Sequence, residues 1–306
     1  MITAPTVIII GAGASFEYGF PLGAKLVKQA VFHTRAPVTA LCKALVSSGV
    51  SADVAGEFSV RLRDSDSNSI DTFLENNREE YVRIGKAAIA LVILLAEADC
   101  LTEGRLLAKP PADHWLKYIW NVVREACSVQ TLQDNRIGFV TFNYDRVLET
   151  YLDGVIQNAF NLEPAAATAL REQAFPIVHL HGQVSNVGFG AYPPGALLNE
   201  QLQEIASGIR VVHDSVPRDD RAFERAFDMI RSAKLICCLG FGYHPTNVGR
   251  LRLKELKAQK AQFCGSAYGM GAAQIQQAEN MLGLSINPTS GNLKCEAFLQ
   301  EHVVLV

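Results

Sequence analysis

The sequence Ile137-Gly-Phe-Val-Thr-Phe-Asn143-Tyr-Asp145, followed by Ile177-Val-His179-Leu-His181-Gly182, decides the fold of this chain. Each half is a short apolar run typical of a buried strand, and each run ends in polar side chains. In an open α/β sheet, ligands bind beyond the carboxyl ends of the strands. We therefore expect Asn143, Asp145 and His181 to lie together at one edge of a sheet and to form a reaction centre.

The N-terminal residues predict a nucleotide-binding turn. A strand over residues 6–10 leads into Gly11-Ala12-Gly13-Ala-Ser15, and helical apolar spacing follows over residues 22–32. Glycines in such a turn let the backbone approach a phosphate. The dinucleotide fingerprint G-x-G-x-x-G is incomplete, because Phe16 stands at the third glycine position. The pattern favours a nucleotide over a standard dehydrogenase cofactor, and a ligand-free strand–helix turn is the alternative.

Two later strands also end in small residues. Residues 234–239 run into Gly240-Phe241-Gly242, and residues 261–264 run into Gly265-Ser266. A basic amphipathic helix is predicted over residues 248–260. Loops of this kind after several strands predict one shared nucleotide crevice.

The predicted fold class is α/β, a Rossmann-like doubly wound parallel sheet with an inserted helical subdomain. Residues 1–35 and 135–306 would form the sheet domain. Residues 36–134 have helical spacing almost throughout and are too long for one crossover, so they predict the insertion. Within them, residues 87–98 are apolar on all sides. This favours burial against a second chain and hence a homo-oligomer.

Composition excludes several classes of protein. The 306 residues are 49% hydrophobic and 19% charged with a net charge of -3, which indicates a globular chain and gives no reason to expect direct nucleic-acid binding. The seven cysteines form no C-x-x-C pair, which predicts reduced thiols and no zinc site. No stretch is long enough to span a membrane, and the N-terminus enters a strand rather than a signal peptide. We expect a cytoplasmic protein.

Taken in order, these motifs resemble the sirtuin superfamily, and specifically its bacterial sirtuin-like NAD-hydrolase branch. Gly11-Ala-Gly-Ala-Ser15 is similar to the GAG-x-S opening loop of that family, Thr141-Phe-Asn-Tyr-Asp145 to its T-x-N-x-D motif, and His181-Gly182 to its catalytic His-Gly. Leu239-Gly-Phe-Gly242 and Gly265-Ser266 resemble its two late ribose and adenine loops. The matches extend from residue 8 to about residue 270.

The departures from the sirtuin pattern bear on the substrate. The chain has no four-cysteine zinc ribbon, Gly19-Phe-Pro21-Leu-Gly23 replaces the Asp-Phe-Arg element, and Phe142 replaces a glutamine. These losses argue against a channel for acyl-lysine. They leave the machinery for NAD binding and for cleavage of the glycosidic bond.

The resemblance implies an NAD glycohydrolase that releases nicotinamide and ADP-ribose, as in antiviral effectors that destroy NAD during phage infection. It implies that Asn143 orients the ribose or the water, that His181 is the general base, and that Asp145 orients Asn143 or a ribose hydroxyl. NAD is then the substrate, and no metal is expected. The implied nucleotide-binding residues are Gly11, Ala12, Gly13, Ser15, Pro21, Thr141, Gly240, Phe241, Gly242, Asn247, Gly265 and Ser266.

Each of these residues also has a purely structural interpretation. Asp145 or Asn247 would start the following helix, Asn143 would form a turn, and His181 would be a satisfied core histidine. The alternative function is a non-catalytic regulatory subunit that binds NAD or ADP-ribose, ahead of a deacylase or a dehydrogenase.

An enzyme that empties a cell of NAD must stay silent until it is triggered, and the sequence shows no trigger domain. We therefore expect activation by assembly or by a protein partner, such as an ATPase or a nucleic-acid-guided protein.

Overall fold

A five-stranded, all-parallel sheet forms the centre of the computed structural model, which describes residues 1–35, 39–47, 49–74, 77, 79–102, 105–106, 111–184, 199–211, 221–258, 261–286 and 292–305. The strand order is β5-β4-β1-β6-β7. The strands are β1 (Thr6–Ile10), β4 (Ile137–Thr141), β5 (Ile177–His179), β6 (Leu235–Leu239) and β7 (Gln262–Gly265). All five lie within two residues of the segments predicted from apolar runs.

The strand order places the expected motifs at one edge. The first three parallel strands in the chain add outward from β1 through β4 to β5, and the chain then crosses to the other side of β1 to add β6 and β7. Residues 6–10 of β1 pair in parallel with both β4 and β6. The order therefore reverses at β1, which is the position where open α/β sheets bind ligands. This arrangement is compatible with a Rossmann-like fold.

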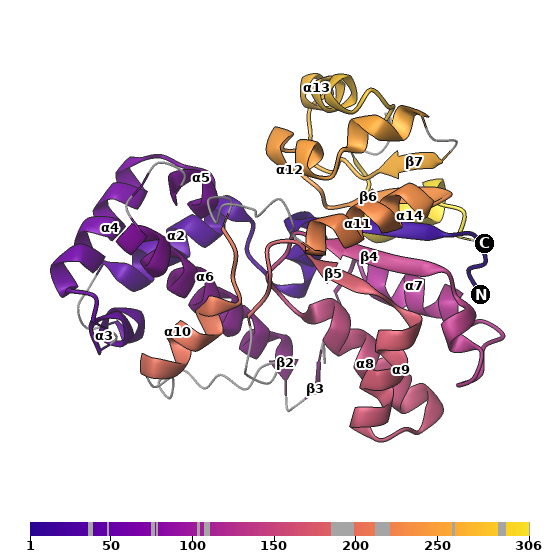
Figure 1. The fold of residues 1–306 in the computed structure, drawn as a ribbon, viewed down its shortest axis with the longest axis horizontal. Helices are drawn as coiled ribbons and strands as arrows, with labels where there is room; N and C mark the ends of the chain where they lie inside the picture. Colours follow the sequence, from indigo (N-terminus) through magenta and orange to yellow (C-terminus); the bar gives the residue numbers. More distant parts are fainter. Residues whose placement is uncertain are drawn as a thin grey trace.

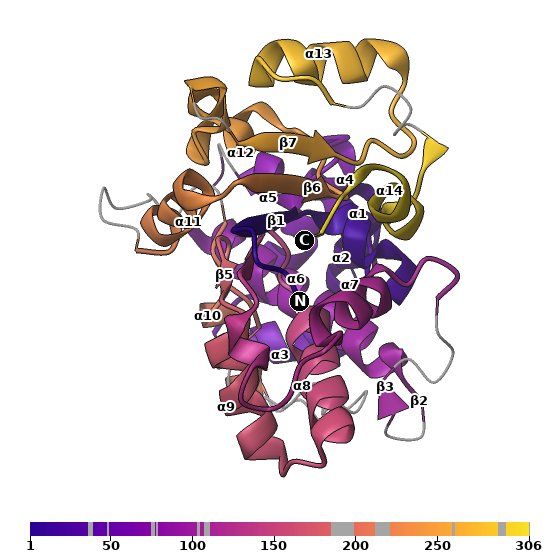
Figure 2. The same cartoon turned by 90° about the vertical axis from the view of Figure 1, so that its right-hand side faces the viewer.

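Helices cover both faces of the sheet, as the continuous apolar strands require. Ile8 and Ile10 pack on one face with α7 (Trp115–Arg124), α8 (Val147–Phe160) and α14 (Cys295–His302). Val7 and Ile9 pack on the other face with α11 (Arg221–Ser232), α12 (Pro245–Arg250) and α13 (Ala272–Leu282). Alternate residues of one strand thus enter two separate cores, and Figure 1 and Figure 2 show the two helical layers.

A group of helices stands beside the carboxyl edge of the sheet (Figure 1). It contains α2 (Gly23–Thr34), α3 (Ala40–Ser47), α4 (Ala52–Asp64), α5 (Ile70–Leu74), α6 (Glu79–Cys100) and α10 (Asn199–Ser207). α10 packs on α6 and α3 although it lies far from them in sequence, whereas α7 packs on α8 and α14 beside the sheet. These contacts cross the expected boundary at residue 135, and the domain division stays a prediction.

The apolar character of α6 is explained inside the chain. Residues Ala87 to Leu94 are each at most 5% exposed, because α2, α3, α4, α5 and α10 surround the helix. A second chain is not needed to cover this surface, so the expectation of a homo-oligomer loses the argument on which it rested. None of the helices within the described ranges is long and apolar enough to cross a membrane.

Three local expectations differ from the structure. The single helix predicted over residues 248–260 is instead α12, which ends at Arg250, and a 3-10 helix (Leu253–Ala258). Arg252 adopts a left-handed φ of 51°, which breaks the helical path between them. The predicted helical stretch also contains two short antiparallel strands, β2 (Leu101–Thr102) and β3 (Arg105–Leu106). The Ala-rich composition of residues 159–175 predicts a helix over this stretch, but α8 ends there at Phe160, Asn161 is left-handed, and α9 (Pro164–Ala174) begins only at Pro164.

Candidate functional site

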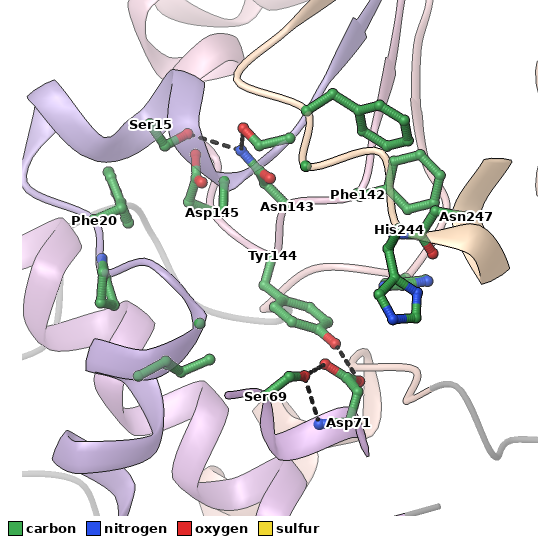
Figure 3. A pocket seen from close by; sticks show the side chains of 18 of the residues that line it. Ser15, Phe20, Ser69, Asp71, Phe142, Asn143, Tyr144, Asp145, His244 and Asn247 are labelled. Carbon is green, nitrogen blue, oxygen red and sulfur yellow. Dashed lines mark hydrogen bonds between the residues drawn. The ribbon is translucent and has the colours of Figure 1, made fainter. Parts of the chain in front are cut away.

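A cavity of about 240 Å³ opens at the carboxyl edge of the sheet, between the strand-end loops and the neighbouring helices (Figure 3). Its lining combines apolar rings with amides, hydroxyls, carboxylates and imidazoles. The lining residues are Gly11, Ala12, Ser15, Phe20, Pro21, Gly23, Leu26, Ser69, Asp71, Ile93, Phe142, Asn143, Tyr144, Asp145, His181, Phe241, Gly242, His244 and Asn247. A mostly apolar lining with a few convergent polar groups is the usual character of a small-molecule site.

The floor of the cavity is formed where the loops after β1 and β6 touch. Gly240 has a φ of +55°, and a Cβ atom on it would lie 1.9 Å from the backbone nitrogen of Ala14. The N–H of Gly13 donates to the carbonyl oxygen of Gly240 at 3.0 Å. Glycine is required at residue 240 because both the close approach and the backbone conformation exclude a side chain.

Hydrogen bonds fix the orientation of the Asn143 side-chain amide. Its Nδ2 donates to the Ser15 hydroxyl oxygen at 2.9 Å and to the Gly11 carbonyl oxygen at 3.1 Å (Figure 3). Both N–H donors of the amide are therefore used, and Oδ1 is the group that can accept a hydrogen bond from a ligand hydroxyl or a water. The backbone N–H of Asn143 is held by the hydroxyl of Thr141 at 3.0 Å.

Asp145 lies behind Ser15 and is only 7% exposed. Burial raises the pKa of this carboxyl to about 6, and a hydrogen bond from the Ser15 hydroxyl partly offsets the increase. Its Oδ1 also accepts from the backbone N–H of Val147 at 3.3 Å, at the start of α8. Asp145 thus supports the start of α8, as its purely structural interpretation expects. It also takes part in a hydrogen-bonded chain from Asp145 to Ser15 to Asn143.

His181 lines the cavity, and one of its ring nitrogens has no partner within the described ranges. The side chain is 7% exposed, and Nε2 is buried with no hydrogen-bond partner among the described residues. Burial lowers the pKa of this imidazole, which favours the neutral ring that can accept a proton. Phe142 contacts the ring edge-on with centroids 5.3 Å apart. A satisfied core histidine would have both nitrogens paired, so this geometry favours a ligand-facing group.

The backbone around His181 is fixed by the next residue. Gly182 has a φ of +67°, and a Cβ atom there would lie 1.9 Å from the carbonyl oxygen of Gly208. This close approach lets the N–H of Arg210 donate to the carbonyl oxygen of His181 at 2.8 Å. The glycine of the His-Gly pair is therefore required for the position of His181.

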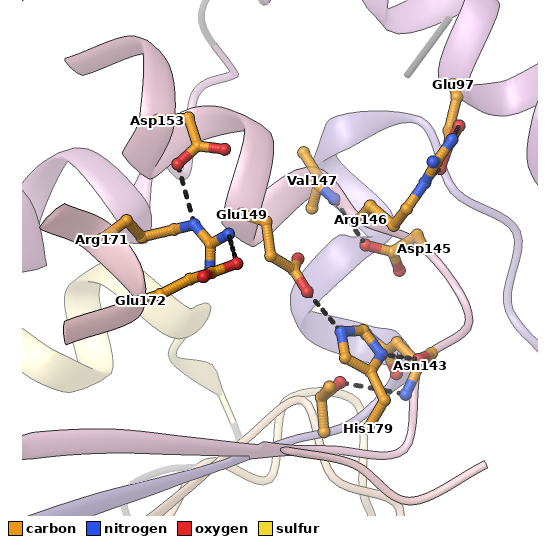
Figure 4. Close-up of polar contacts among 11 residues, drawn as sticks. Glu97, Asn143, Asp145, Arg146, Val147, Glu149, Asp153, Arg171, Glu172 and His179 are labelled. Carbon is orange, nitrogen blue, oxygen red and sulfur yellow. Dashed lines mark hydrogen bonds and ion pairs between the residues drawn. The ribbon is translucent and has the colours of Figure 1, made fainter. Parts of the chain in front are cut away.

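A buried ion pair supports the Asn143 loop from behind (Figure 4). His179 Nε2 lies 2.5 Å from Glu149 Oε1, and His179 Nδ1 lies 3.0 Å from the carbonyl oxygen of Asn143. Burial alone would lower the pKa of His179, but the adjacent Glu149 carboxylate outweighs burial and the pKa is raised. The pKa of Glu149 is lowered because His179 outweighs the effect of burial. The charged ring donates from both nitrogens.

The structure brings most, but not all, of the expected nucleotide-binding residues to the cavity. Gly11, Ala12, Ser15, Pro21, Phe241, Gly242 and Asn247 line it with Asn143, Asp145 and His181. Asn247 lies inside α12, since His244 is the residue before the helix, so its interpretation as the helix N-cap is wrong.

Five expected residues lie outside the lining and hold the loops instead. They are Gly13, Thr141, Gly240, Gly265 and Ser266. The Ser266 hydroxyl oxygen accepts from the N–H of Gly240 at 2.9 Å. Gly265 packs against the hydroxyl of Tyr243, where a Cβ atom would be 2.0 Å from the oxygen. These contacts place the β7 end behind the β6 loop, one layer from the cavity.

Sequence reasoning missed four polar cavity residues, one of which is Tyr144 between Asn143 and Asp145. Asp71 and Ser69 come from the start of α5, and His244 comes from the loop before α12. A carboxylate at a helix start is usually a capping group, so the sequence contained no signal that Asp71 faces the cavity.

Comparison of the chain with protein-family models and with curated proteins gives no match. In the part of the chain that the structure describes, no three His, Cys, Asp or Glu side chains gather as metal ligands would. His179, which lies two residues from His181, is instead committed to Glu149 and to the Asn143 carbonyl.

Proposed function

We propose that this chain is an NAD glycohydrolase of the sirtuin-like type, which cleaves NAD to nicotinamide and ADP-ribose. The observation that carries the proposal is the unpartnered Nε2 of His181, a side chain that lines the same cavity as the fixed amide of Asn143. A neutral imidazole and a fixed carbonyl oxygen are suited to activate a hydroxyl or a water at a cation-like sugar carbon. We choose NAD as the substrate because the order of the sequence motifs resembles that of sirtuin-like NAD hydrolases.

The size and lining of the cavity suit one end of an NAD molecule. Its volume of about 240 Å³ is below the roughly 300–1,000 Å³ of pockets that enclose whole drug-sized ligands, so it suits one end of NAD. Phe20, Leu26 and Ile93 provide an apolar wall for a nicotinamide ring. Gly11 and Gly242 line the cavity from the loops after β1 and β6, at the switch point of the sheet, where the phosphates would lie.

In the proposed reaction, the chain's own groups orient the reactants and move one proton. Asn143 Oδ1 accepts a hydrogen bond from the ribose or the attacking water, and the Ser15–Asp145 pair keeps the amide turned that way. His181 Nε2 takes the proton from that hydroxyl or water. Water adds to C1′ of the ribose, while the electron pair of the C1′–N bond leaves with neutral nicotinamide. The proton on His181 then passes to solvent.

The proposal includes the finer architecture and the biological setting. We propose that the sheet is a Rossmann-like doubly wound domain and that the helical insertion expected over residues 36–134 contributes Asp71 of α5 and Ile93 of α6 to the cavity, whereas α7 belongs with the sheet. The protein is a cytoplasmic anti-phage effector, silent until assembly or an activating partner such as an ATPase or a nucleic-acid-guided protein releases it. NAD consumption then ends the infection by ending the metabolism of the cell.

The test is nicotinamide release from NAD by the purified chain, alone and with the product of a neighbouring gene, followed by chromatography. We expect little or no release from the isolated wild type and clear release with the partner, and we expect the His181→Ala and Asn143→Ala variants to lose that release. Glu172→Gln on the exposed side of α9 is the folded control. Calorimetric NAD binding with no release under any condition would favour the non-catalytic regulatory role. Full activity of His181→Ala would refute the site.

A further inference from the structure

One carboxylate in the cavity wall comes from the helices that precede β4, and it is held at both oxygens. Asp71 Oδ1 accepts from the Tyr144 hydroxyl at 3.1 Å, and Oδ2 accepts from the Ser69 hydroxyl at 3.3 Å (Figure 3). The backbone N–H of Asp71 donates to the same Ser69 oxygen at 3.1 Å. The orientation of the carboxylate is therefore fixed before any ligand enters.

Tyr144 connects this carboxylate to His181. The Tyr144 ring is 8% exposed and tilts by 34° against the imidazole, with centroids 6.2 Å apart. Phe142 also contacts the imidazole, edge-on with centroids 5.3 Å apart, so two aromatic rings pack against His181. The Tyr144 hydroxyl lies 3.1 Å from Asp71 Oδ1 and 3.4 Å from the carbonyl oxygen of Arg210, so Asp71 is the nearer acceptor and α5 helps to fix the position of this ring.

Among the charged groups near His181, Asp71 is the one that acts to raise the pKa of the imidazole. Burial lowers the pKa of His181, Asp71 opposes this effect, and Arg250 of α12 adds to it. The other ionisable side chains of the cavity are Asp145, His244 and Tyr144, and Arg210 contributes its backbone N–H. Asp71 is thus the group whose negative charge favours the protonated form of the imidazole.

We propose that Asp71 is a positioning residue for His181: it fixes the imidazole through Tyr144, and its charge stabilises the imidazolium that forms when His181 takes a proton. The inference rests on the proposed hydrolase function. It gives α5 a direct role at the reaction centre, because the group that stabilises the protonated base comes from a helix outside the sheet. The same charge also favours the positive ribose centre of the transition state.

The test follows the His181 imidazole directly. Imidazole resonances of ¹⁵N-histidine-labelled protein, with His181 assigned by its absence in His181→Ala, are titrated in the wild type and in Asp71→Asn. The asparagine keeps the size of the side chain and an oxygen for Tyr144, removes the charge, and presents an NH2 group to the Ser69 hydroxyl. We expect the titration midpoint of His181 to move to lower pH. Asp64→Asn, an exposed carboxylate at the end of α4, is the matched control and should leave the midpoint in place.

Turnover provides the second measurement. We expect kcat for nicotinamide release to fall about tenfold in Asp71→Asn with KM nearly constant, since a transition-state interaction is lost. Tyr144→Phe, which keeps the ring and loses the anchor, should reduce kcat in the same direction and provides a second variant if Asp71→Asn does not fold. A His181 midpoint that stays unchanged in Asp71→Asn would overturn the inference. A wild type that releases no nicotinamide even with the activating partner would instead refute the proposed function, while the titration would still decide whether Asp71 acts on His181.

Discussion

His179 and Glu149 form a buried ion pair directly behind the loop that carries Asn143. The His179 ring joins the Glu149 carboxylate at 2.5 Å to the Asn143 carbonyl oxygen at 3.0 Å, so one side chain links α8 to the candidate site. Oε2 of Glu149 is buried without a hydrogen-bond partner among the described residues. The charge of Glu149 therefore depends strongly on His179, and the pair has consequences for both stability and pH dependence.

Replacing Glu149 by Gln should lower the free energy of unfolding by about 3 kcal/mol, the scale for removing one member of a buried pair. The reason is that the charged His179 loses its counter-ion in a buried position. Chemical denaturation at pH 7 measures the effect, and Glu172→Gln, an exposed carboxylate in α9, is the control. Equal stability of the wild type and Glu149→Gln would show that the pair contributes nothing.

The pair also predicts a stability window in pH. The raised pKa of His179 adds stability that is complete below its unfolded value near 6.5 and is lost as pH rises through the folded value. The lowered pKa of Glu149 adds stability above its unfolded value near 4.5 that is lost as pH falls through the folded value. The difference in stability between the wild type and His179→Gln should therefore be largest between about pH 4.5 and 6.5. A difference that grows steadily above pH 7 would contradict this assignment.

Asp145 should show the opposite behaviour from a salt-bridged carboxylate. Its pKa is raised to about 6 by burial, so the folded protein binds a proton that the unfolded chain does not bind between about pH 4 and 6. Wild type should gain stability relative to Asp145→Asn as the pH falls from 7 to 4. Paired denaturation curves at pH 7, 5.5 and 4 measure this difference. If the difference does not change with pH, the carboxyl titrates outside that range.

Ser15→Ala should reduce nicotinamide release without abolishing it. The hydroxyl accepts one N–H of the Asn143 amide and bonds to Asp145, so its loss frees the amide to rotate. A hydrogen bond worth about 0.5–1.5 kcal/mol corresponds to a reduction of roughly twofold to tenfold in kcat. Ser15→Thr, which keeps the hydroxyl, should retain more activity than Ser15→Ala. A complete loss of activity in Ser15→Ala with the fold intact would mean that Ser15 has a chemical role of its own.

Gly240→Ala should destabilise the protein and separate the two loops of the cavity floor. The new Cβ atom would collide with the Ala14 backbone at a residue that needs a positive φ. We expect a loss of more than about 1–2 kcal/mol, because strain adds to the backbone cost. Gly154→Ala in α8 is the control, since nothing lies within 4 Å of its added Cβ atom and it should be neutral or stabilising. Thermal unfolding of the two variants beside the wild type measures this prediction.

The sequence by itself determined the strands and the edge at which they end. Apolar runs such as residues 6–10 and 235–239 must be buried on both sides, and this requirement alone predicts a parallel sheet with polar loops at its carboxyl edge. Asn143, Asp145 and His181 followed directly, because each is placed by the end of a strand.

Only the tertiary structure decided which groups complete the site. Asp71 reaches the cavity because α5 packs on α2 and α6 and meets Tyr144 of the loop after β4, and His179 supports Asn143 because α8 brings Glu149 to it. Local spacing contains no information on such contacts between distant segments. The tertiary structure also showed that α6 is covered by its own chain and that residues 248–258 break at Arg252. The cover of α6 depends on which helices pack against it, and the break depends on the backbone conformation of Arg252. An apolar or amphipathic pattern determines neither of these.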